Sequence, residues 1–458
     1  MPTMPSATGW VDRLGDTTFL VPGGDANGLS RALTEAANKA TSSAPWIILL
    51  QPGIYQPTAQ LTLPSYTCLL GAGRDCTRID MANVPNGIAM VGDGTVNLRF
   101  QDIEIYDHRG SGGLPAQPLS IHDAQGFSTE SCRFDHLSSG GGGYSFIKQD
   151  TSSHSSNSAY DVRLANSQFI GASFDNIIIT NCNLRAFSCL FQNTPTQSGS
   201  DNVRLQTGGT WEFYGCDIIM ISSQTYTGTP GAALQLGSST TGWTLILDGC
   251  RVLFDLSSGD VNGATVQWGT IATSNFNEDY TLTIIGSKID YKTGTITSAA
   301  VVAGLVLGNA GANATNGSVR LIGSEIRDLG GSGGTVRTDV VINGTAVGGN
   351  KILKSFTQSG SRAKWDYKLA GGFIPVPANY GYTDQTTNFQ AASAAFATAA
   401  TVAVTLGTSF PASALDYNVH LEPSANETFW VSGKTNTGFT LNSSNATSTA
   451  TVRYVVVR

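Results

Sequence analysis

Short segments of alternating apolar and polar residues recur down the middle of the chain. The clearest copies follow the pattern apolar-x-apolar-x-polar-(Cys/Ser)-x-apolar and cover 211–218, 245–252, 282–289 and 319–326. Alternation with a period of two indicates strands, and the small residue that interrupts it indicates a turn. The Cys/Ser position repeats after 34 residues from Cys216 to Cys250 and after 37 to Ser287. A period of that length is typical of a solenoid whose strand–turn–strand units stack on one another.

Weaker repeats extend this pattern. The motif Leu-x-Leu-Gly at 234–237 and its later copies predict a second strand face in each coil, and earlier copies of the main motif lie near 98–105, 127–134 and 162–169. The interval from Ser167 to Cys182 is only 15 residues, so these two copies are expected on different faces of one larger coil. Seven to nine rungs spaced about 4.8 Å apart would make a rod roughly 35 to 45 Å long.

Two columns of the repeat have distinct expected roles. The cysteines of the Cys/Ser column are predicted to form a reduced, packed stack, because no C-x-x-C pair supports a metal site. The residue after each Cys/Ser position should face solvent, where opposite charges on neighbouring rungs would set the register. The first column contains Cys132, Cys182, Cys216 and Cys250, and the second contains Glu104, Arg133, Gln168, Asn183, Asp217, Arg251, Lys288 and Glu325.

Composition excludes several classes of protein. The 458 residues carry a net charge of −7, and 53 of them are glycine, which suits turn-rich β structure. Clustered Lys and Arg are missing, so a nucleic-acid partner is not expected. No apolar run of about 20 residues predicts a membrane span. The N-terminal residues lack the basic and apolar regions of a secretion signal, so we expect synthesis in a reducing bacterial cytoplasm.

The segment 23–80 carries a family resemblance. Asn27 can cap a helix with one apolar face, and the runs Pro52-Gly53-Ile54-Tyr55 and Leu69-Leu70-Gly71-Ala72-Gly73 follow it. This order resembles the capping segment and first coil of the pectate-lyase-like right-handed parallel β-helix superfamily, which includes lyases, hydrolases, phage tailspikes and inert rods. The resemblance implies an all-β fold: a right-handed parallel β-helix whose N-terminal capping helix seals one end.

The pattern divides the chain into four parts. We predict an N-terminal arm over 1–22, the capped parallel β-helix over 23–349, an irregular connector over 350–377 and a small C-terminal β-sandwich over 378–458. The sequence from Tyr417 onward resembles the small domains at the C-termini of many phage tail-fibre proteins. Trp430 and Phe439 could form a ligand platform there, but their strand positions favour core packing.

The candidate catalytic and binding residues cluster in the early coils, where four of the five histidines lie between residues 108 and 154. Carboxylates stacked on adjacent rungs approach each other closely enough for general acid–base catalysis. The alternative is that these are polar turn residues at a solvated edge. The candidate catalytic residues are Asp107, Asp135 and His136, and the candidate glycan-binding residues are Asp93, His122, Asp123, Tyr144, Asp150 and Tyr160.

The resemblance implies a phage-type spike or fibre that is part of a virion and binds host cell-surface polysaccharide. Its expected partners are that polysaccharide, other virion proteins and further copies of itself, since similar spikes form trimers. No cofactor or metal is expected. Two alternatives stay open: a polysaccharide depolymerase, either lyase or glycoside hydrolase, on the same β-helix, and a purely structural virion component.

Overall fold

The computed structural model divides into two units by internal contacts. Unit 1 comprises Met1–Gly348 and Ile352–Thr383, and unit 2 comprises Gly349–Lys351 and Asp384–Arg458. The structure describes residues 12–13, 17–85, 87–109, 117–136, 146–149, 162–171, 175–195, 200–222, 225–226, 231–237, 242–261, 267–273, 280–296, 301–307, 317–330, 332–333, 336–344, 353–359, 365–369, 372–376, 382–383, 389–406 and 418–457.

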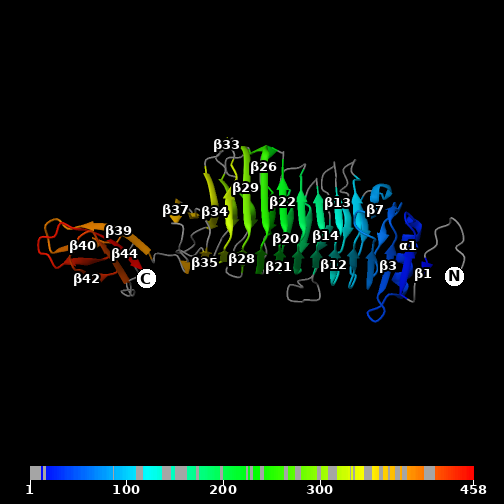
Figure 1. Ribbon diagram of the computed structural model, residues 1–458, viewed down its shortest axis with the longest axis horizontal. Coiled ribbons are helices and arrows are strands. Elements are labelled where there is room, and N and C mark those ends of the chain that lie inside the picture. Colours follow the sequence, from blue (N-terminus) through cyan, green and yellow to red (C-terminus); the bar gives the residue numbers. More distant parts are fainter. Residues whose placement is uncertain are drawn as a thin grey trace. The chain divides into compact units, whose positions relative to one another are not determined.

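Unit 1 is built from three long, mainly parallel sheets (Figure 1), and each coil adds one strand to each sheet in turn. Sheet 1 contains β1 (Asp12–Arg13), β2 (Thr18–Val21), β3 (Trp46–Leu50), β6 (Thr67–Leu70), β9 (Arg99–Gln101), β12 (Phe127–Glu130), β15 (Val162–Ala165), β18 (Leu184–Phe187), β21 (Gly209–Tyr214), β25 (Trp243–Asp248), β28 (Thr281–Ile285), β31 (Gly317–Ile322), β35 (Leu353–Ser359) and β38 (Tyr382–Thr383).

Sheet 2 contains β4 (Gly53–Tyr55), β7 (Thr77–Asp80), β10 (Glu104–Asp107), β13 (Arg133–His136), β16 (Gln168–Gly171), β19 (Leu190–Asn193), β22 (Asp217–Ile221), β23 (Thr225–Tyr226), β26 (Arg251–Val261), β29 (Lys288–Ile296), β32 (Glu325–Asp328) and β33 (Ser332–Gly333). Sheet 3 contains β5 (Leu61–Thr62), β8 (Ile88–Val91), β11 (Gln117–Ser120), β14 (Phe146–Gln149), β17 (Ile177–Thr180), β20 (Val203–Gln206), β24 (Leu234–Leu236), β27 (Gln267–Thr273), β30 (Val301–Leu307), β34 (Val336–Gly344), β36 (Trp365–Leu369) and β37 (Gly372–Val376). This three-sided stack confirms the predicted parallel β-helix, for which right-handed crossovers are the rule.

The strand register confirms the main repeat and corrects one part of it. Trp211 pairs with Leu245, Leu245 with Leu282, and Leu282 with Val319, as the sequence pattern predicts. In the earlier coils, however, Leu190 and not Asn183 occupies the column next to Asp217. Ser167 and Cys182 do lie at different corners of one coil, as predicted, but that coil is short and not large. A complete, shorter coil of 22 residues joins Ser167 to Cys189, and Cys182 lies outside the column.

The stack is also longer than predicted. Among the described residues sheet 1 alone orders fourteen strands, and all but β1 and β38 pair in parallel. Twelve parallel strands at about 4.8 Å spacing span roughly 50 to 55 Å, against the seven to nine rungs that the motif indicates. The count of motif copies omits β2, β3 and β6 because no Cys or Ser occupies the column position of these rungs.

A hydrogen-bond ladder explains the Cys/Ser column. The side chain of each column residue donates a hydrogen bond to the backbone carbonyl two residues earlier, as Cys216 Sγ does to Tyr214 O (3.5 Å). It also accepts a hydrogen bond from the backbone N–H of the column residue in the preceding coil, as Cys250 Sγ does from Cys216 N (3.4 Å). Gly215 before the column has a φ of +59°, a left-handed conformation that favours glycine. The column contains Cys132, Ser167, Cys189, Cys216, Cys250, Ser287 and Ser324. Burial raises the pKa of Cys132 to about 12, so this thiol stays protonated.

The N-terminal end is closed by α1 (Ala26–Lys39), which packs against β2, β3 and β5. Its N-cap is Asp25, whose Oδ1 accepts a hydrogen bond from Gly28 N at 2.8 Å, and not the predicted Asn27. Leu29, Leu33 and Ala36 are buried on the helix face that covers the core. The capping helix that the resemblance implies is therefore present.

Aromatic side chains fill the interior of the coils. Phe134, Phe169 and Phe191 stack at 5.0 and 5.2 Å between neighbouring centroids, one from each successive rung of sheet 2. Trp211 is fully buried, as expected for a core position. No helix among the described residues is long and apolar enough to cross a membrane.

The unit boundaries differ from those expected at both ends. β2 belongs to sheet 1, so the last residues of the predicted arm already form the first rung. At the other end β35 pairs in parallel with β31, and β36 with β34, within the segment expected to be an irregular connector. The division between units follows Thr383 and not Gly349. The apolar alternation does not reveal these rungs because polar residues such as Lys354 and Gln358 occupy them.

Unit 2 is the expected small β-sandwich (Figure 1). One antiparallel sheet holds β39 (Phe389–Ala395), β44 (Thr451–Val457) and β41 (Asn418–Pro423), and the other holds β40 (Thr401–Thr405), β43 (Gly438–Ser443) and β42 (Phe429–Thr435). Phe439 is 3% exposed and lies in the core, as predicted. Trp430 is 48% exposed, so the expectation of core packing was wrong for this residue.

Candidate functional site

The outer face of sheet 2 carries a group of polar side chains on adjacent rungs. Successive residues of a strand point to opposite faces, so Glu104 and Tyr106 face outward from β10 while the buried Ile105 faces the core. Register places Arg78 and Arg133 on either side of Glu104, and Asp135 beside Tyr106. Three consecutive strands, β7, β10 and β13, thus build one surface, which we call the sheet 2 network.

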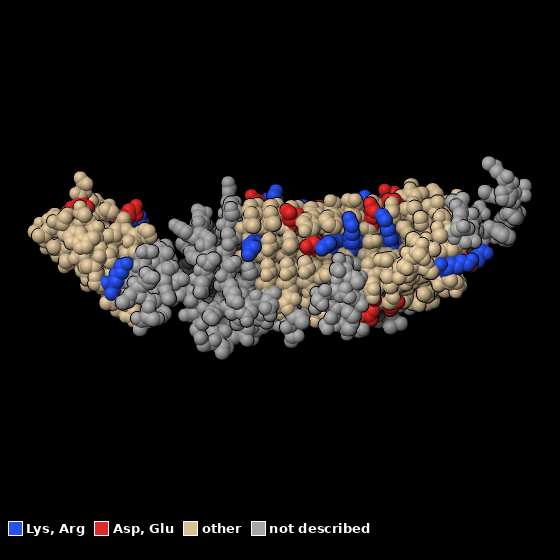
Figure 2. All heavy atoms as spheres, turned by 90° about the horizontal axis from the view of Figure 1, so that it is seen from below, with Lys and Arg blue, Asp and Glu red and all other residues tan. Residues whose placement is uncertain are grey.

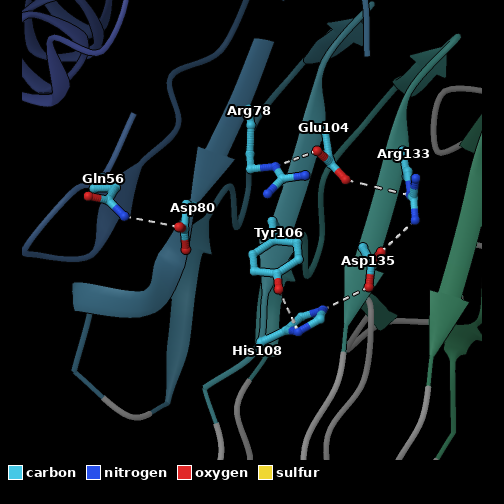
Figure 3. A network of polar contacts seen from close by, with 8 residues as sticks. All are labelled: Gln56, Arg78, Asp80, Glu104, Tyr106, His108, Arg133 and Asp135. Atoms are coloured by element: carbon cyan, nitrogen blue, oxygen red, sulfur yellow. Dashed lines mark hydrogen bonds and ion pairs between the residues drawn. The ribbon is translucent and has the colours of Figure 1, made fainter. Parts of the chain in front are cut away.

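Ion pairs fix the upper part of the sheet 2 network (Figure 3). Arg78 Nε lies 2.5 Å from Glu104 Oε2, and Arg133 Nε lies 3.6 Å from Glu104 Oε1. Arg133 also donates to Asp135 Oδ2 through Nη2 at 2.8 Å. The Glu104 side chain is 5% exposed, whereas those of Arg78 and Arg133 are 37% and 33% exposed. The carboxylate therefore orients two guanidinium groups whose remaining donors reach solvent.

A second chain of contacts links Tyr106, His108 and Asp135. Tyr106 Oη lies 2.8 Å from His108 Nδ1, and His108 Nε2 lies 2.8 Å from Asp135 Oδ1 (Figure 3). The two rings stack with centroids 3.8 Å apart, and Arg78 lies over the Tyr106 ring at 4.6 Å. Desolvation and the nearby Asp135 carboxylate raise the pKa of Tyr106. The phenol is therefore a hydrogen-bond donor at neutral pH, and the arrangement can pass a proton between phenol, imidazole and carboxylate.

The structure separates the three candidate catalytic residues. Asp107 and His136 pair in register on β10 and β13, as predicted, but both side chains face the interior. Asp107 accepts hydrogen bonds from Arg109 Nε and Nη2, each at 2.8 Å, and its side chain has no exposure. Asp135 faces the opposite side of the sheet because it is the neighbour of His136 in the strand. Only Asp135 of the three reaches the solvent-facing network.

Burial decides the charge state of the interior histidine. The pKa of His136 is lowered to about 4, chiefly by desolvation, although the Asp107 carboxylate opposes this effect. The ring is neutral at physiological pH. Asp107, Arg109 and His136 therefore form a polar cluster inside the β-helix, separate from the outer face of sheet 2.

The other predicted group lies at the corner between sheets 3 and 1. Asp93, which is exposed, accepts hydrogen bonds from Ser120 Oγ at 2.7 Å and from His122 N at 2.8 Å. Asp123 occupies the turn with a φ of +52°. The structure thus brings Asp93, His122 and Asp123 together, but in a turn and away from the sheet 2 network. Tyr144, Asp150 and Tyr160 lie outside the described residues.

Sequence reasoning missed a buried acidic pair at the corner between sheets 2 and 3. Arg204 Nη1 lies 2.7 Å from Asp175 Oδ2, and its Nε lies 3.0 Å from Asp201 Oδ2. The Asp175 and Asp201 side chains are 0% and 2% exposed. Burial raises the pKa of Asp175 to about 6, and burial together with the Asp175 charge raises the pKa of Asp201 to about 8. Only folding shows this cluster, because 26 residues separate the two acids in the chain.

The predicted ladder of facing charges is present in register but only partly in contact. Lys288 pairs with Glu325, and Asp217 with Arg251, on neighbouring strands. Arg251, however, reaches Asp290 at 3.5 Å, and Arg327 joins the same carboxylate at 2.7 Å. Figure 2 shows blue and red side chains gathered along the β-helix, and on the outer face of sheet 1 Arg185 lies 2.8 Å from Glu212. Among the described residues no group of three or more His, Cys, Asp or Glu has the geometry of a metal site.

Comparisons with known proteins find likeness in architecture alone. No protein-family model matches the chain, and no curated protein matches it. Among solved structures, the Dettilon tailspike protein is 10% identical with a TM-score of 0.47, over 96% of this chain and 94% of that one. A tailspike protein of Acinetobacter baumannii bacteriophage Fri1, described as a capsular polysaccharide depolymerase, is 9% identical with a TM-score of 0.37, over 97% and 84%. The tailspike of Pseudomonas phage LKA1 is 12% identical with a TM-score of 0.36, over 88% and 67%.

Proposed function

We propose that this chain is a spike or fibre protein of a phage or phage-like particle, and that it binds host cell-surface polysaccharide through the sheet 2 network. The observation that carries the proposal is the set of preorganised, half-exposed groups on the outer face of β7, β10 and β13. Arg78 and Arg133 are held by Glu104 while part of each guanidinium faces water. Sugars present vicinal hydroxyls, which planar donors in a fixed orientation recognise without a large ordering cost.

Three further features support the virion setting. The sequence resembles a superfamily that includes phage tailspikes, and the C-terminal sequence resembles the C-terminal domains of phage tail-fibre proteins. The stacked coils give unit 1 a long lateral surface along which a polymer can lie. We propose that the chain assembles with itself, most simply as a trimer, and with other virion proteins. Light scattering tests this assembly: a mass of three times 47.9 kDa supports the trimer, and a mass of 47.9 kDa contradicts it.

A binding assay tests the network directly. The purified chain is presented to an array of bacterial capsular and lipopolysaccharide glycans, with Arg133→Ala as the variant. Loss of charge-assisted hydrogen bonds should weaken binding by about 10- to 100-fold. Arg251→Ala is the matched control, because Arg251 lies on the same outward column of sheet 2, four rungs further along, and also pairs with an aspartate. Equal binding by Arg133→Ala and the wild type would contradict the proposal.

The alternative function is a polysaccharide depolymerase, and the Tyr106–His108–Asp135 chain is the observation that favours it. These three groups are linked at 2.8 Å and lie where a bound glycan would pass. Their test is the release of new reducing ends or unsaturated products from a polysaccharide that binds. A depolymerase loses this release in Asp135→Asn while glycan binding persists, whereas a pure binding protein shows no release in either form.

A further inference from the structure

Among its described residues, unit 2 exposes one large aromatic side chain, on an otherwise small and polar sheet face. Trp430 lies on β42, the edge strand of its sheet, and 48% of it is exposed. Its strand neighbours Phe429 and Val431 pack against the core of the sandwich. The alternation of the strand therefore aims the indole outward, and no packing within the sandwich accounts for a tryptophan at this position.

The register identifies what surrounds the indole. Trp430 pairs with Asn442 of β43, which pairs with Thr401 of β40. The next row outward on the same face is Ser432, Thr440 and Ala403. This surface, which we call the Trp430 face, thus combines one aromatic ring with one amide and three hydroxyl groups, and neither row contains a charged residue.

The polar groups of the Trp430 face are held in place but not all used. Asn442 donates from Nδ2 to Ser432 Oγ at 2.8 Å and to the carbonyl of Trp430 at 3.2 Å, which fixes the amide beside the indole. Within the described part of the chain, Asn442 Oδ1 receives no hydrogen bond and the indole Nε1 donates none. A fixed acceptor and an unused donor thus flank an aromatic ring that stacks on no other described ring.

We propose that the Trp430 face is a second carbohydrate-binding site, specific for an uncharged sugar. The apolar C–H face of a pyranose packs on an indole, while its hydroxyls need both donors and acceptors at the ring edge, as Nε1, Asn442 and Ser432 supply. The lack of charge in the two rows argues against a nucleic acid or an acidic polymer. A second protein chain is disfavoured because protein interfaces centre on several large apolar side chains, and the described residues of this face offer one.

This proposal does not rest on the sheet 2 network, because the two sites lie in separate units of the chain. It gives unit 2 a role of its own, as a second point of binding to the same cell surface. Two weak sites on one chain raise the overall avidity well beyond that of either, provided that one surface presents both ligands. The variants of one site should therefore leave the intrinsic affinity of the other unchanged.

The test uses the full chain and an array of neutral polysaccharides, including dextran, mannan and galactan, with affinity electrophoresis as the readout. Trp430→Ala should lose retardation by about 10- to 100-fold in apparent affinity, and Trp430→Phe should keep part of it. His420→Ala is the matched control, since His420 is exposed on β41 of the opposite sheet.

Three results would overturn the proposal. The first is retardation of Trp430→Ala equal to that of the wild type, and the second is the absence of retardation by every neutral polysaccharide tested. The third is a fall in the solution mass of Trp430→Ala measured by light scattering, which would assign the Trp430 face to contact between copies of the chain. The Asn442→Ala variant offers an independent check, because it keeps the indole and removes only the amide.

Discussion

The inner and outer faces of sheet 2 hold polar side chains under opposite conditions. On β10 and β13 the inner face buries Asp107 and His136, while the outer face carries Glu104 and Asp135 beside the partly exposed Arg133. Inside, Asp107 is paired with Arg109, since an unpaired charge in the core costs several kcal/mol, and His136 is neutral. The outer groups can exchange their partners for a ligand. Polarity alone therefore does not mark a functional residue in a β-helix; the face of the strand does.

The largest expected effect comes from breaking the interior ion pair. Asp107→Ala leaves the Arg109 guanidinium, whose side chain is 3% exposed, without its bidentate partner. We expect a loss of about 3 to 5 kcal/mol in the free energy of unfolding. Denaturant unfolding measures it, and a loss below about 1 kcal/mol would show that water or rearrangement satisfies the arginine.

The next largest effect is the dependence of the free energy of unfolding on pH that the buried pair Asp175 and Asp201 causes. The pKa values of Asp175 and Asp201 are raised in the folded chain to about 6 and about 8, from 3.8. Between these limits the folded state holds more protons than the unfolded state, so this pair makes stability fall as pH rises. The slope is at most about 1.4 kcal/mol per pH unit for each proton.

Asp201→Asn tests the pH effect because it removes one titrating group. The free energies of unfolding at about pH 5 and about pH 8, between which the pair loses its protons in the folded state, should differ less in this variant than in the wild type. Asp217→Asn serves as the control, since Asp217 is exposed on the outer face of sheet 2. An unchanged pH slope in Asp201→Asn would mean that Arg204 keeps both carboxylates ionised.

A smaller effect is expected in the Cys/Ser ladder, which is interior but uncharged. Cys216→Ala removes the acceptor for the Cys189 amide and should cost about 1 to 3 kcal/mol. Cys216→Ser should cost less, because serine fills the same position at Ser287 and Ser324 with the same contacts. Thermal unfolding of both variants measures the difference, and equal losses would mean that packing volume and not the hydrogen bond matters.

The smallest effect on stability is expected on the outer face. Arg133→Ala removes a partly exposed ion pair and should change the free energy of unfolding by about 0 to 1 kcal/mol. The same variant should lose glycan binding, so stability and function separate at this position. A stability loss as large as that of Asp107→Ala would erase the distinction between the two faces.

The sequence by itself determined the architecture. Period-two alternation, the 34- to 37-residue repeat and the segment after Asn27 predicted a capped parallel β-helix, and the later strands predicted the terminal sandwich. The register from Trp211 to Val319 followed directly, because each coil repeats the same inward side chains. Alternation also placed Glu104 and Arg133 on one outward column. These features are local or periodic, so they can be read from the order of residues alone.

Only the tertiary structure decided which polar groups meet. Coil length varies between 21 residues and 37, and the 22-residue coil after Ser167 shifted the register so that Cys189 replaced Cys182 in the ladder. Adjacent Asp135 and His136 looked like one site in the sequence, yet a strand sends them to opposite faces. Asp175 and Asp201, which are 26 residues apart in the chain, meet only because neighbouring coils stack on each other. Such contacts depend on loop lengths and on strand pairing, and folding alone fixes both.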